Sequence, residues 1–383
     1  MLAGAAMAVV SAFWVVRTEN YEFLNMDDPT YVFGNPHVTA GFTVDGLKWA
    51  ATNVRVGNNW HPATFVSLMA DAELSDGTVG SMSKAMHRHN AILHGFCSAL
   101  LFLVMMRFLG AGKGCPLPFV LTLCWALHPL RAECVCWVAE RKELLCTACS
   151  LLTILLWTVR RGWATVLATA AYALAIMSKS VAVTLPMILI ATDLMREADW
   201  RKCVRSRWWL WVLLFLFAGG ASVFTLIAQA PAVAPNQDES PFAVKVANAF
   251  GAYAIHFSRV IAPVGLSFSR MYVNTVIWTA FIPGLALVGL MLWSAWRYLA
   301  GGRSPGSPAG AGFLAAAWIG AGLLPMCGLI RVGVEFNPDR YGHWVGAGLA
   351  VVTALLLGRM PVRPSRWIAA GLAGAAAVFA VLS

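Results

Sequence analysis

Apolar runs separated by short polar segments fill most of this 383-residue chain. A membrane-spanning helix needs about 20 predominantly apolar residues, or somewhat fewer when interfacial aromatic residues flank it. Eleven runs meet this requirement, at residues 2–16, 91–109, 116–130, 143–159, 163–179, 180–195, 208–228, 276–296, 311–330, 342–358 and 367–382. The pattern predicts an all-α polytopic membrane protein in which residues 1–383 form one transmembrane domain.

The composition leads to the same class of protein. Apolar residues make up 59% of the chain and charged residues only 12%, and a soluble domain cannot bury so much apolar surface. The first run has no Arg or Lys before its apolar core and no A-x-A-like site after it. We therefore expect a first membrane helix here, not a cleaved signal peptide.

Basic residues gather in every second connection between the runs. With the N-terminus in the cytoplasm, 14 of the 28 Lys and Arg residues fall in cytoplasmic connections, beside three acidic residues. The outward segments hold the other 14 together with 15 acidic residues. This is the positive-inside pattern, so the net charge of +10 reports topology. A nucleic-acid partner is not expected, because no basic stripe lies on a soluble domain.

Two outward segments are long. Residues 17–90 form a first extracytoplasmic loop that is too long for a passive connector, and we expect two interfacial helices in it, near 42–51 and 61–75. The segment 229–275 contains an apolar run at 240–263 that breaks the alternation of charge if it crosses the membrane. We expect that run to be a re-entrant or interfacial helix.

An acidic pair, Asp27 and Asp28, follows the first run in the sequence "NMDDP". Neighbouring carboxylates repel, so either one has a raised pKa or both are held by basic groups. A carboxylate at the mouth of a cavity can accept a proton from a hydroxyl, which is the task of a general base. A helix cap followed by Pro29 explains the same residues.

A second polar segment, "LHPLRAECVCWVAERKELL" at 127–145, joins two of the runs. It contains His128 and Glu140, and then Arg141 and Lys142 at the expected start of a helix. There a phosphate can gather side-chain and backbone N–H donors. The alternative is that the two bases pair with Glu140 and Glu143 in an interfacial ion network.

Two further outward turns carry charge at the membrane edge. Lys179 stands in a tight turn, where it either snorkels to the interface or completes a basic phosphate-binding set. The segment "NPDRYGHW" contains Asp339, Arg340 and Tyr341. In the simpler interpretation Asp339 and Arg340 pair with each other and the aromatic residues anchor the interface.

The histidines and cysteines give weaker indications. His61 faces the same outward side, but the spacing of "HRHNAILH" at 87–94 is not that of a zinc site, so structural histidines are expected. The "CTAC" at 146–149 lies inside an apolar run without a second ligand pair. We interpret its cysteines as small packing residues, not as metal ligands.

Six segments in order carry a resemblance to a known family. They are "NMDDPTYVFGNPHV", "NWHPATFVSLMAD", "HRHNAILHG", "LHPLRAECVCWVAERKELL", "MSKSVAVTLPMILIATDL" and "NPDRYGHW". Together they resemble bacterial GT-C glycosyltransferases that carry TPR repeats and, more distantly, the metazoan transmembrane and TPR-repeat O-mannosyltransferases. The resemblance covers about residues 20 to 345.

The resemblance implies a GT-C fold and a bacterial inner-membrane location. It also implies a polyprenyl-phosphate-sugar donor whose sugar is transferred on the outer side, with inversion of the configuration at the anomeric carbon. It places the acidic pair at the catalytic centre and the basic residue of the E-R-K block on the lipid phosphate. The matching positions in this sequence are Asp27 and Asp28, Arg141 beside Lys142, and Asp339, Arg340 and Tyr341. We see no TPR repeats, so acceptor recruitment by such repeats is either missing or supplied by a separate subunit. The sequence "GHW" departs from the family after D-R-Y.

The residues and the resemblance lead to one chemistry. Asp27 or Asp28 deprotonates the acceptor hydroxyl, and we prefer Asp27. The departing phosphate is stabilised by four basic residues, Arg141, Lys142, Arg340 and Lys179. The lipid tail lies in a groove between spans. Adjacent carboxylates can also bind Mg²⁺ or Mn²⁺ through water, but "DD" is not D-x-D, and we expect the basic residues to act without metal.

Other functions are compatible with the same residues. The acceptor is a protein hydroxyl, as in O-glycosylation, or a glycolipid or envelope polysaccharide modified by the same chemistry. Mannose or another hexose is the expected sugar, from the more distant relatives alone. A transporter or flippase of an isoprenoid-linked substrate also suits charges at the membrane edge, but matching inverted repeats are not visible.

Overall fold

Helices make up all the regular structure in the described part of the computed structural model. The structure describes residues 1–110, 116–197, 199–230, 240–301, 307–329, 336, 338–358 and 362–382. Within these ranges it contains no β-strand. The predicted all-α class is therefore confirmed.

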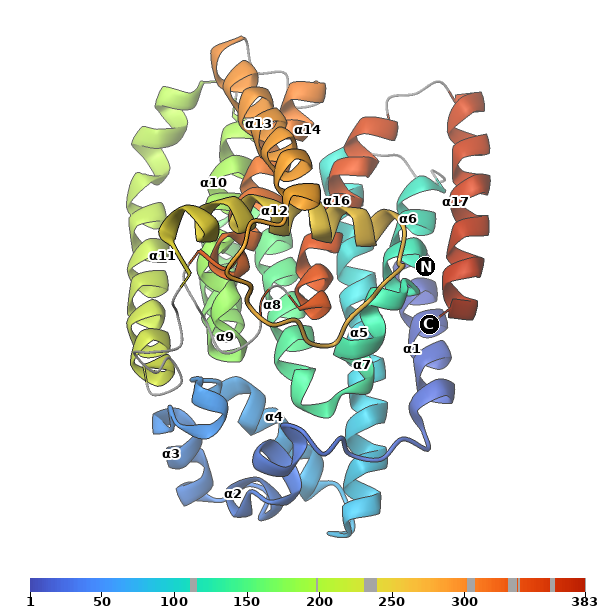
Figure 1. The fold of residues 1–383 in the computed structure, drawn as a ribbon, viewed down its shortest axis with the longest axis vertical. Coiled ribbons are helices and arrows are strands. Elements are labelled where there is room, and N and C mark those ends of the chain that lie inside the picture. The colour runs from blue at the N-terminus through green and yellow to red at the C-terminus, as the bar shows by residue number, and fades with distance from the viewer. Residues whose placement is uncertain are drawn as a thin grey trace.

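A bundle of roughly parallel and antiparallel helices forms the body of the molecule (Figure 1). Its helices are α1 (Leu2–Thr18), α5 (Val79–Leu109), α6 (Leu117–Ala126), α8 (Arg141–Trp157), α9 (Gly162–Ser178), α10 (Leu185–Arg196), α11 (Trp200–Gln229), α13 (Trp278–Ala300), α14 (Pro308–Ala315), α15 (Ala321–Leu323), α16 (Gly342–Leu357) and α17 (Val362–Leu382). Short helices connect them, among them α7 (Ala132–Cys136) and the 3-10 helices Val138–Glu140, Ser180–Thr184 and Asp339–Tyr341.

Four described helical segments are long and apolar enough to cross a membrane. They are Val79–Leu109, Trp200–Gln229, Trp278–Ala300 and Pro308–Met326. Leu117–Ala126 and Pro129–Cys136, bent by 58° at their junction, make a fifth if they form one broken span. The apolar helices Leu2–Thr18, Gly162–Ser178 and Ala370–Leu382 are shorter. The molecule has the helices of a membrane protein.

All eleven predicted runs fall on helices, but eleven crossings are not confirmed. Several of the helices are too short to cross the hydrocarbon core alone. The 12 residues of α10, for example, extend about 18 Å at 1.5 Å per residue, against a core about 30 Å thick. The sequence pattern recognised the apolar segments correctly, whereas the number of crossings stays a prediction.

The segment that we predicted as the first extracytoplasmic loop folds into a small helical unit at one end of the bundle (Figure 1). We call it the outer unit, after its predicted side. It contains α2 (Pro36–Thr39), α3 (Val44–Thr52) and α4 (Pro62–Glu73). Thr43 caps α3 by accepting a hydrogen bond from the Gly46 amide at 2.9 Å. The two helices predicted near 42–51 and 61–75 are therefore present. They pack around a core of their own, in which Phe65, Leu68 and Met69 are buried.

The helix α5 links this outer unit to the bundle. It begins at Val79, where Thr78 caps it through the Ser81 amide, so its first turns lie in the segment that we assigned to the loop. It packs closely on α1 at Gly95, where a Cβ atom would meet the Ser11 hydroxyl and the Met7 carbonyl. This close approach holds the first helix against the core of the bundle.

The helix α12 (Phe242–Ile261) runs across the bundle, crosswise to the long helices (Figure 1). One face is buried and includes Ala247, Ala252 and His256, whereas Phe242 and Ile261 at its ends are exposed. It corresponds to the run at 240–263, for which we predicted a re-entrant or interfacial helix. Its depth in the membrane stays a prediction.

Candidate functional site

The carboxylates of Asp27 and Asp28 have different environments. Asp28 is fully buried and accepts hydrogen bonds from the backbone amides of Leu24 and Ala139, both at 2.8 Å. Burial raises the pKa of Asp28, and the two amides partly offset this effect. The side chain of Asp27 is 43% exposed. Asp28 therefore fastens the loop to the Val138–Glu140 turn, and Asp27 is the member of the pair that a substrate can reach.

Lys142 is the cation that pairs with Asp27 among the described residues. Its ammonium Nζ lies 3.5 Å from Asp27 Oδ2 and 3.1 Å from Glu140 Oε1. It also lies over two aromatic rings, 4.8 Å from the centroid of Tyr31 and 5.4 Å from that of Trp137. The two carboxylates and two ring faces fix the ammonium beside Asp27 although the lysine is buried.

Glu140 is the centre of the charged cluster. Beside its contact with Lys142, it lies 3.2 Å from the ammonium of Lys179 and 3.4 Å from Nε of Arg340. Burial alone would raise the pKa of Glu140, but Lys142, Lys179 and Arg340 together lower it. A fixed negative charge therefore holds three cations from three distant parts of the sequence in one place.

Further pairs surround this centre. The Lys179 ammonium lies 2.7 Å from Glu143, and Arg340 Nη1 lies 2.8 Å from Glu133. Tyr341 presents its ring to both cations, at 5.2 Å from Lys179 and 5.7 Å from Arg340. The structure thus brings the predicted Lys142, Lys179, Arg340 and Tyr341 together near Asp27.

We call this group the acid–base cluster. It consists of Asp27, Glu133, Glu140, Lys142, Glu143, Lys179 and Arg340. Four carboxylates face three cations, so the cluster has no excess of positive charge. An anionic ligand must therefore be held here by directed hydrogen bonds from positioned donors, not by net attraction.

Arg141 does not join the cluster. Its guanidinium pairs with Asp71 and donates to Asn90 Oδ1 and the Met86 carbonyl, each at 2.7 Å. Asp71 also accepts a hydrogen bond from His89. These contacts occupy the Arg141 side chain and join α8 to α4 and α5. The predicted phosphate-binding pair of Arg141 and Lys142 is therefore divided between two places.

Asp339 and Arg340 do not pair with each other. Asp339 pairs with Arg259 and with Arg270, whose Nη1 lies 3.1 Å from Oδ1, and it accepts a hydrogen bond from the Ser267 amide. These partners belong to α12 and the following loop. The simpler interpretation of the D-R-Y segment was wrong because each member of the pair binds a charge from a distant part of the chain.

The two candidate histidines lie in different places. His61 is buried at the start of α4, with Nδ1 3.4 Å from the Tyr31 hydroxyl. Burial lowers the pKa of His61 well below its usual value, and Lys142 and Lys179 lower it further, so the ring is neutral at pH 7. His128 Nδ1 instead accepts the Leu130 amide, and Nε2 contacts the Val260 carbonyl at 3.1 Å. His128 is a local cap away from the cluster.

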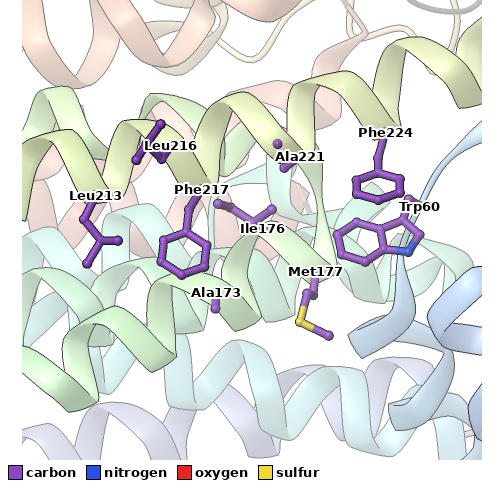
Figure 2. Close-up of a pocket in the computed structure, with 10 residues that line it drawn as sticks. Trp60, Ala173, Ile176, Met177, Leu213, Leu216, Phe217, Ala221 and Phe224 are labelled. Carbon is purple, nitrogen blue, oxygen red and sulfur yellow. The ribbon is translucent and has the colours of Figure 1, made fainter.

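An apolar groove of about 400 Å³ lies between α9 and α11 (Figure 2). At its outer end Trp60 stacks on Phe224 with the ring centroids 5.1 Å apart. Trp60 directly precedes His61, and the groove residue Met177 lies two positions before Lys179. A groove therefore lies between two apolar helices, and Lys179 of the acid–base cluster follows its lining by two positions. That a lipid tail lies in it stays a prediction.

The acidic pair does not fit a divalent metal. Both oxygens of Asp28 accept backbone amides, and Oδ2 of Asp27 lies beside the Lys142 ammonium. Among the described residues, no group of three or more His, Cys, Asp and Glu side chains is arranged to hold a metal ion.

Sequence reasoning missed Asp71 and the pair of Arg259 and Arg270. Asp71 had a signal, because it stands three residues after Leu68 on the apolar face of the helix predicted at 61–75. A charged residue on a buried face needs a buried partner. Arg259 and Arg270 had no comparable signal.

The comparisons with known proteins add no assignment. The chain matches no protein-family model, no curated protein and no solved structure.

Proposed function

We propose that this chain is an inverting glycosyltransferase that moves a sugar from a polyprenyl-phosphate donor to an acceptor hydroxyl on the outer side of the membrane. One observation carries the proposal: the exposed Asp27 carboxylate lies 3.5 Å from the Lys142 ammonium. Glu140 joins Lys142 to Lys179, which follows the groove residue Met177 by two positions. The reaction needs three parts: a general base, a cation that donates hydrogen bonds to the phosphate, and a groove for the lipid tail. The resemblance to GT-C glycosyltransferases supports the same function.

Asp27 acts as the general base in the proposed reaction. It takes the proton of the acceptor hydroxyl as the oxygen forms a bond to the anomeric carbon. The bond from that carbon to the phosphate oxygen breaks on the opposite face, and its electron pair stays on the phosphate. The configuration at the anomeric carbon is therefore inverted.

The cations of the acid–base cluster stabilise the leaving group. The donor phosphate has one negative charge, and the departing polyprenyl phosphate gains a second. Lys142, Lys179 and Arg340 are held near that position by Glu140, so little reorganisation is needed as the charge grows. At the same time Asp27 gains a proton, so the total charge of the site and its reactants does not change.

The groove between α9 and α11 accommodates the lipid tail. Along α11 its lining extends from Leu213 to Phe224, about 17 Å at 1.5 Å per residue. Its lining is apolar and aromatic, which suits an isoprenoid chain but not a sugar. A tail held there places the attached phosphate at the groove end near His61 and Lys179.

The proposal also includes the class of sugar and the class of acceptor. By analogy with the more distant relatives we propose a hexose such as mannose and a protein hydroxyl, with the glycolipid or envelope polysaccharide as the alternative acceptor. No observation on the described residues favours the transporter alternative over the transferase.

One variant and one control variant test the function. Purified protein is given a radiolabelled polyprenyl-phosphate hexose and a membrane extract, and label in protein, glycolipid and water is measured separately. Asp27→Asn is expected to lower transfer by about 10²- to 10⁴-fold, the usual contribution of a general base. Asp45→Asn, which removes an exposed carboxylate of α3, should leave transfer unchanged. Equal transfer by wild type and Asp27→Asn would refute the proposed base.

The transporter alternative has a separate outcome. Wild-type protein in vesicles that moves the labelled lipid across the bilayer without transferring its sugar would support transport and contradict the transferase.

A further inference from the structure

A second groove lies between α1, α4, α5 and α8. Its volume is about 410 Å³. The apolar part is lined by Met7, Ile92, Leu93, Phe96 and Leu145. Ile92 and Phe96 are each about two-fifths exposed, so the groove opens to the outside of the bundle. It is separate from the groove between α9 and α11 and takes no part in the proposed transfer.

The polar end of this second groove is formed by the triad of Asp71, His89 and Arg141. Arg141 neutralises Asp71, and His89 Nδ1 lies 2.5 Å from the same carboxylate. The His89 side chain is 38% exposed, so its other face is open at the mouth of the groove. The triad therefore brings no net negative charge to a ligand.

Two exposed bases extend the polar end along α5. Arg88 stands one helical turn before Ile92, and Lys84 stands one turn before Arg88, so the three residues form one stripe. The distance along the helix axis from Lys84 to Ile92 is about 12 Å. The predicted apolar run begins at residue 91. The bases thus lie just outside the membrane boundary that the sequence predicts, and the apolar lining lies just inside it.

We propose that this second groove binds an anionic phospholipid of the outer leaflet. One acyl chain lies along Ile92, Leu93 and Phe96, and the headgroup phosphate lies near Lys84, Arg88 and His89. The arrangement matches such a lipid at both ends, because the chain meets apolar side chains and the phosphate meets positive charge. The acid–base cluster has no such excess of positive charge, because its carboxylates outnumber its cations.

The bound lipid would strengthen the attachment of the outer unit to the bundle. The groove walls come from α4 of the outer unit and from α5 and α8 of the bundle, and the Asp71–Arg141 pair joins the same helices. A ligand that contacts all of these helices stabilises the folded arrangement by mass action. Binding is therefore expected to raise the melting temperature of the detergent-solubilised protein.

Native mass spectrometry of the purified full chain measures the binding directly. Phosphatidylglycerol and phosphatidylcholine with identical acyl chains serve as the probes, and thermal unfolding is followed in parallel. We expect phosphatidylglycerol to bind at least tenfold more tightly and to raise the melting temperature. The variant in which Lys84 and Arg88 are both changed to Gln should lose most of this preference. A matched variant with Lys48 and Arg55 changed to Gln should keep it, because it removes the same charge from exposed positions outside the groove.

A filling variant tests the position of the acyl chain. Ala70→Trp places a large side chain in the second groove, and Gly220→Trp does the same in the groove between α9 and α11. Only Ala70→Trp should lower phosphatidylglycerol binding. Equal binding of the two lipids, equal losses in the two double Gln variants, or an isoprenoid lipid that copurifies and is lost only in Ala70→Trp would each overturn the proposal. None of these measurements depends on sugar transfer.

Discussion

Arg141 and Lys142 are consecutive residues at the start of α8, and their side chains enter separate sets of contacts. Arg141 pairs with Asp71 and joins the bundle to the outer unit, whereas Lys142 lies 3.1 Å from Glu140 and 3.5 Å from Asp27 in the acid–base cluster. Neighbouring positions on a helix point about 100° apart, so two adjacent bases can serve two purposes. Substitutions at the two positions should therefore have different consequences.

Replacing Arg141 should mainly lower stability. Arg141→Gln leaves the buried Asp71 carboxylate without its guanidinium partner, and breaking a buried pair on one side typically costs about 3–5 kcal/mol. Arg141→Lys should recover only part of this loss, because an ammonium cannot reproduce the fork that contacts Asp71, Asn90 and Met86. Thermal unfolding in detergent measures the effect. Arg55→Gln, an exposed change of equal charge, is the control, and similar melting temperatures for the two Gln variants would contradict the assignment.

Replacing Lys142 should mainly lower the rate of sugar transfer. In Lys142→Gln, Glu140 keeps its contacts with Lys179 and Arg340, so the fold should persist. The leaving phosphate loses a positioned donor, an effect that typically costs about 10²- to 10³-fold in rate. Steady-state kinetics with the polyprenyl-phosphate hexose should show this loss in kcat, whereas Lys48→Gln should behave as wild type. A variant that unfolds but keeps its rate per folded molecule would argue against a role on the phosphate.

The sequence pattern predicted the helical class, the apolar segments and the two helices of the outer unit, because these depend on local periodicity and capping. Thr43 is an example, since its role as the cap of α3 follows from neighbouring residues alone. The partners of the charged side chains depend on tertiary packing and could not be predicted in this way. Asp339 pairs with Arg259 and Arg270, residues about 70 to 80 positions away, and not with the adjacent Arg340.

The acid–base cluster was predicted in its residue types but not in its geometry. Sequence position indicated that Asp27, Lys142, Lys179 and Arg340 share the outward side, and the structure brings them together. The direction of a charged side chain at a helix start depends on the position of its oppositely charged partner in the fold. Arg141 pairs with Asp71. In the sequence, the only indication of this pair is that Asp71 lies on an otherwise apolar helix face.

Asp28 should affect stability in a pH-dependent manner. Burial raises its pKa in the folded protein above the ordinary value of 3.8, so folding favours the protonated carboxyl. Its contribution to the free energy of unfolding is then full below pH 3.8 and declines as the pH rises through the raised pKa. The destabilisation caused by Asp28→Asn should therefore be larger near pH 4 than at pH 7. Melting temperatures of wild type and variant across this range test the sign, and a difference that grows with pH would contradict it.

If the proposed transfer takes place, the groove between α9 and α11 should determine how well the protein uses donors with long lipid tails. Gly220 lines this groove, and a Cβ atom there meets no atom within 4 Å, so Gly220→Leu can fill the groove without a clash on its own helix. We expect the KM for a long-tailed polyprenyl-phosphate hexose to rise about tenfold, the size of effect that blocking one or two apolar contacts produces. A donor with a tail of two isoprene units should be affected much less.

The neighbouring residue provides a matched control for this variant. Gly219 precedes Gly220 in α11, its Cβ position is equally open, and it does not line the groove. Gly219→Leu should therefore leave the KM of both donors unchanged while it changes helix propensity by the same amount. If both Leu variants raise the KM of the long-tailed donor equally, the effect comes from α11 as a whole and the tail lies elsewhere. If only Gly220→Leu does so, and only for the long tail, the groove holds the isoprenoid chain while the acid–base cluster holds its phosphate.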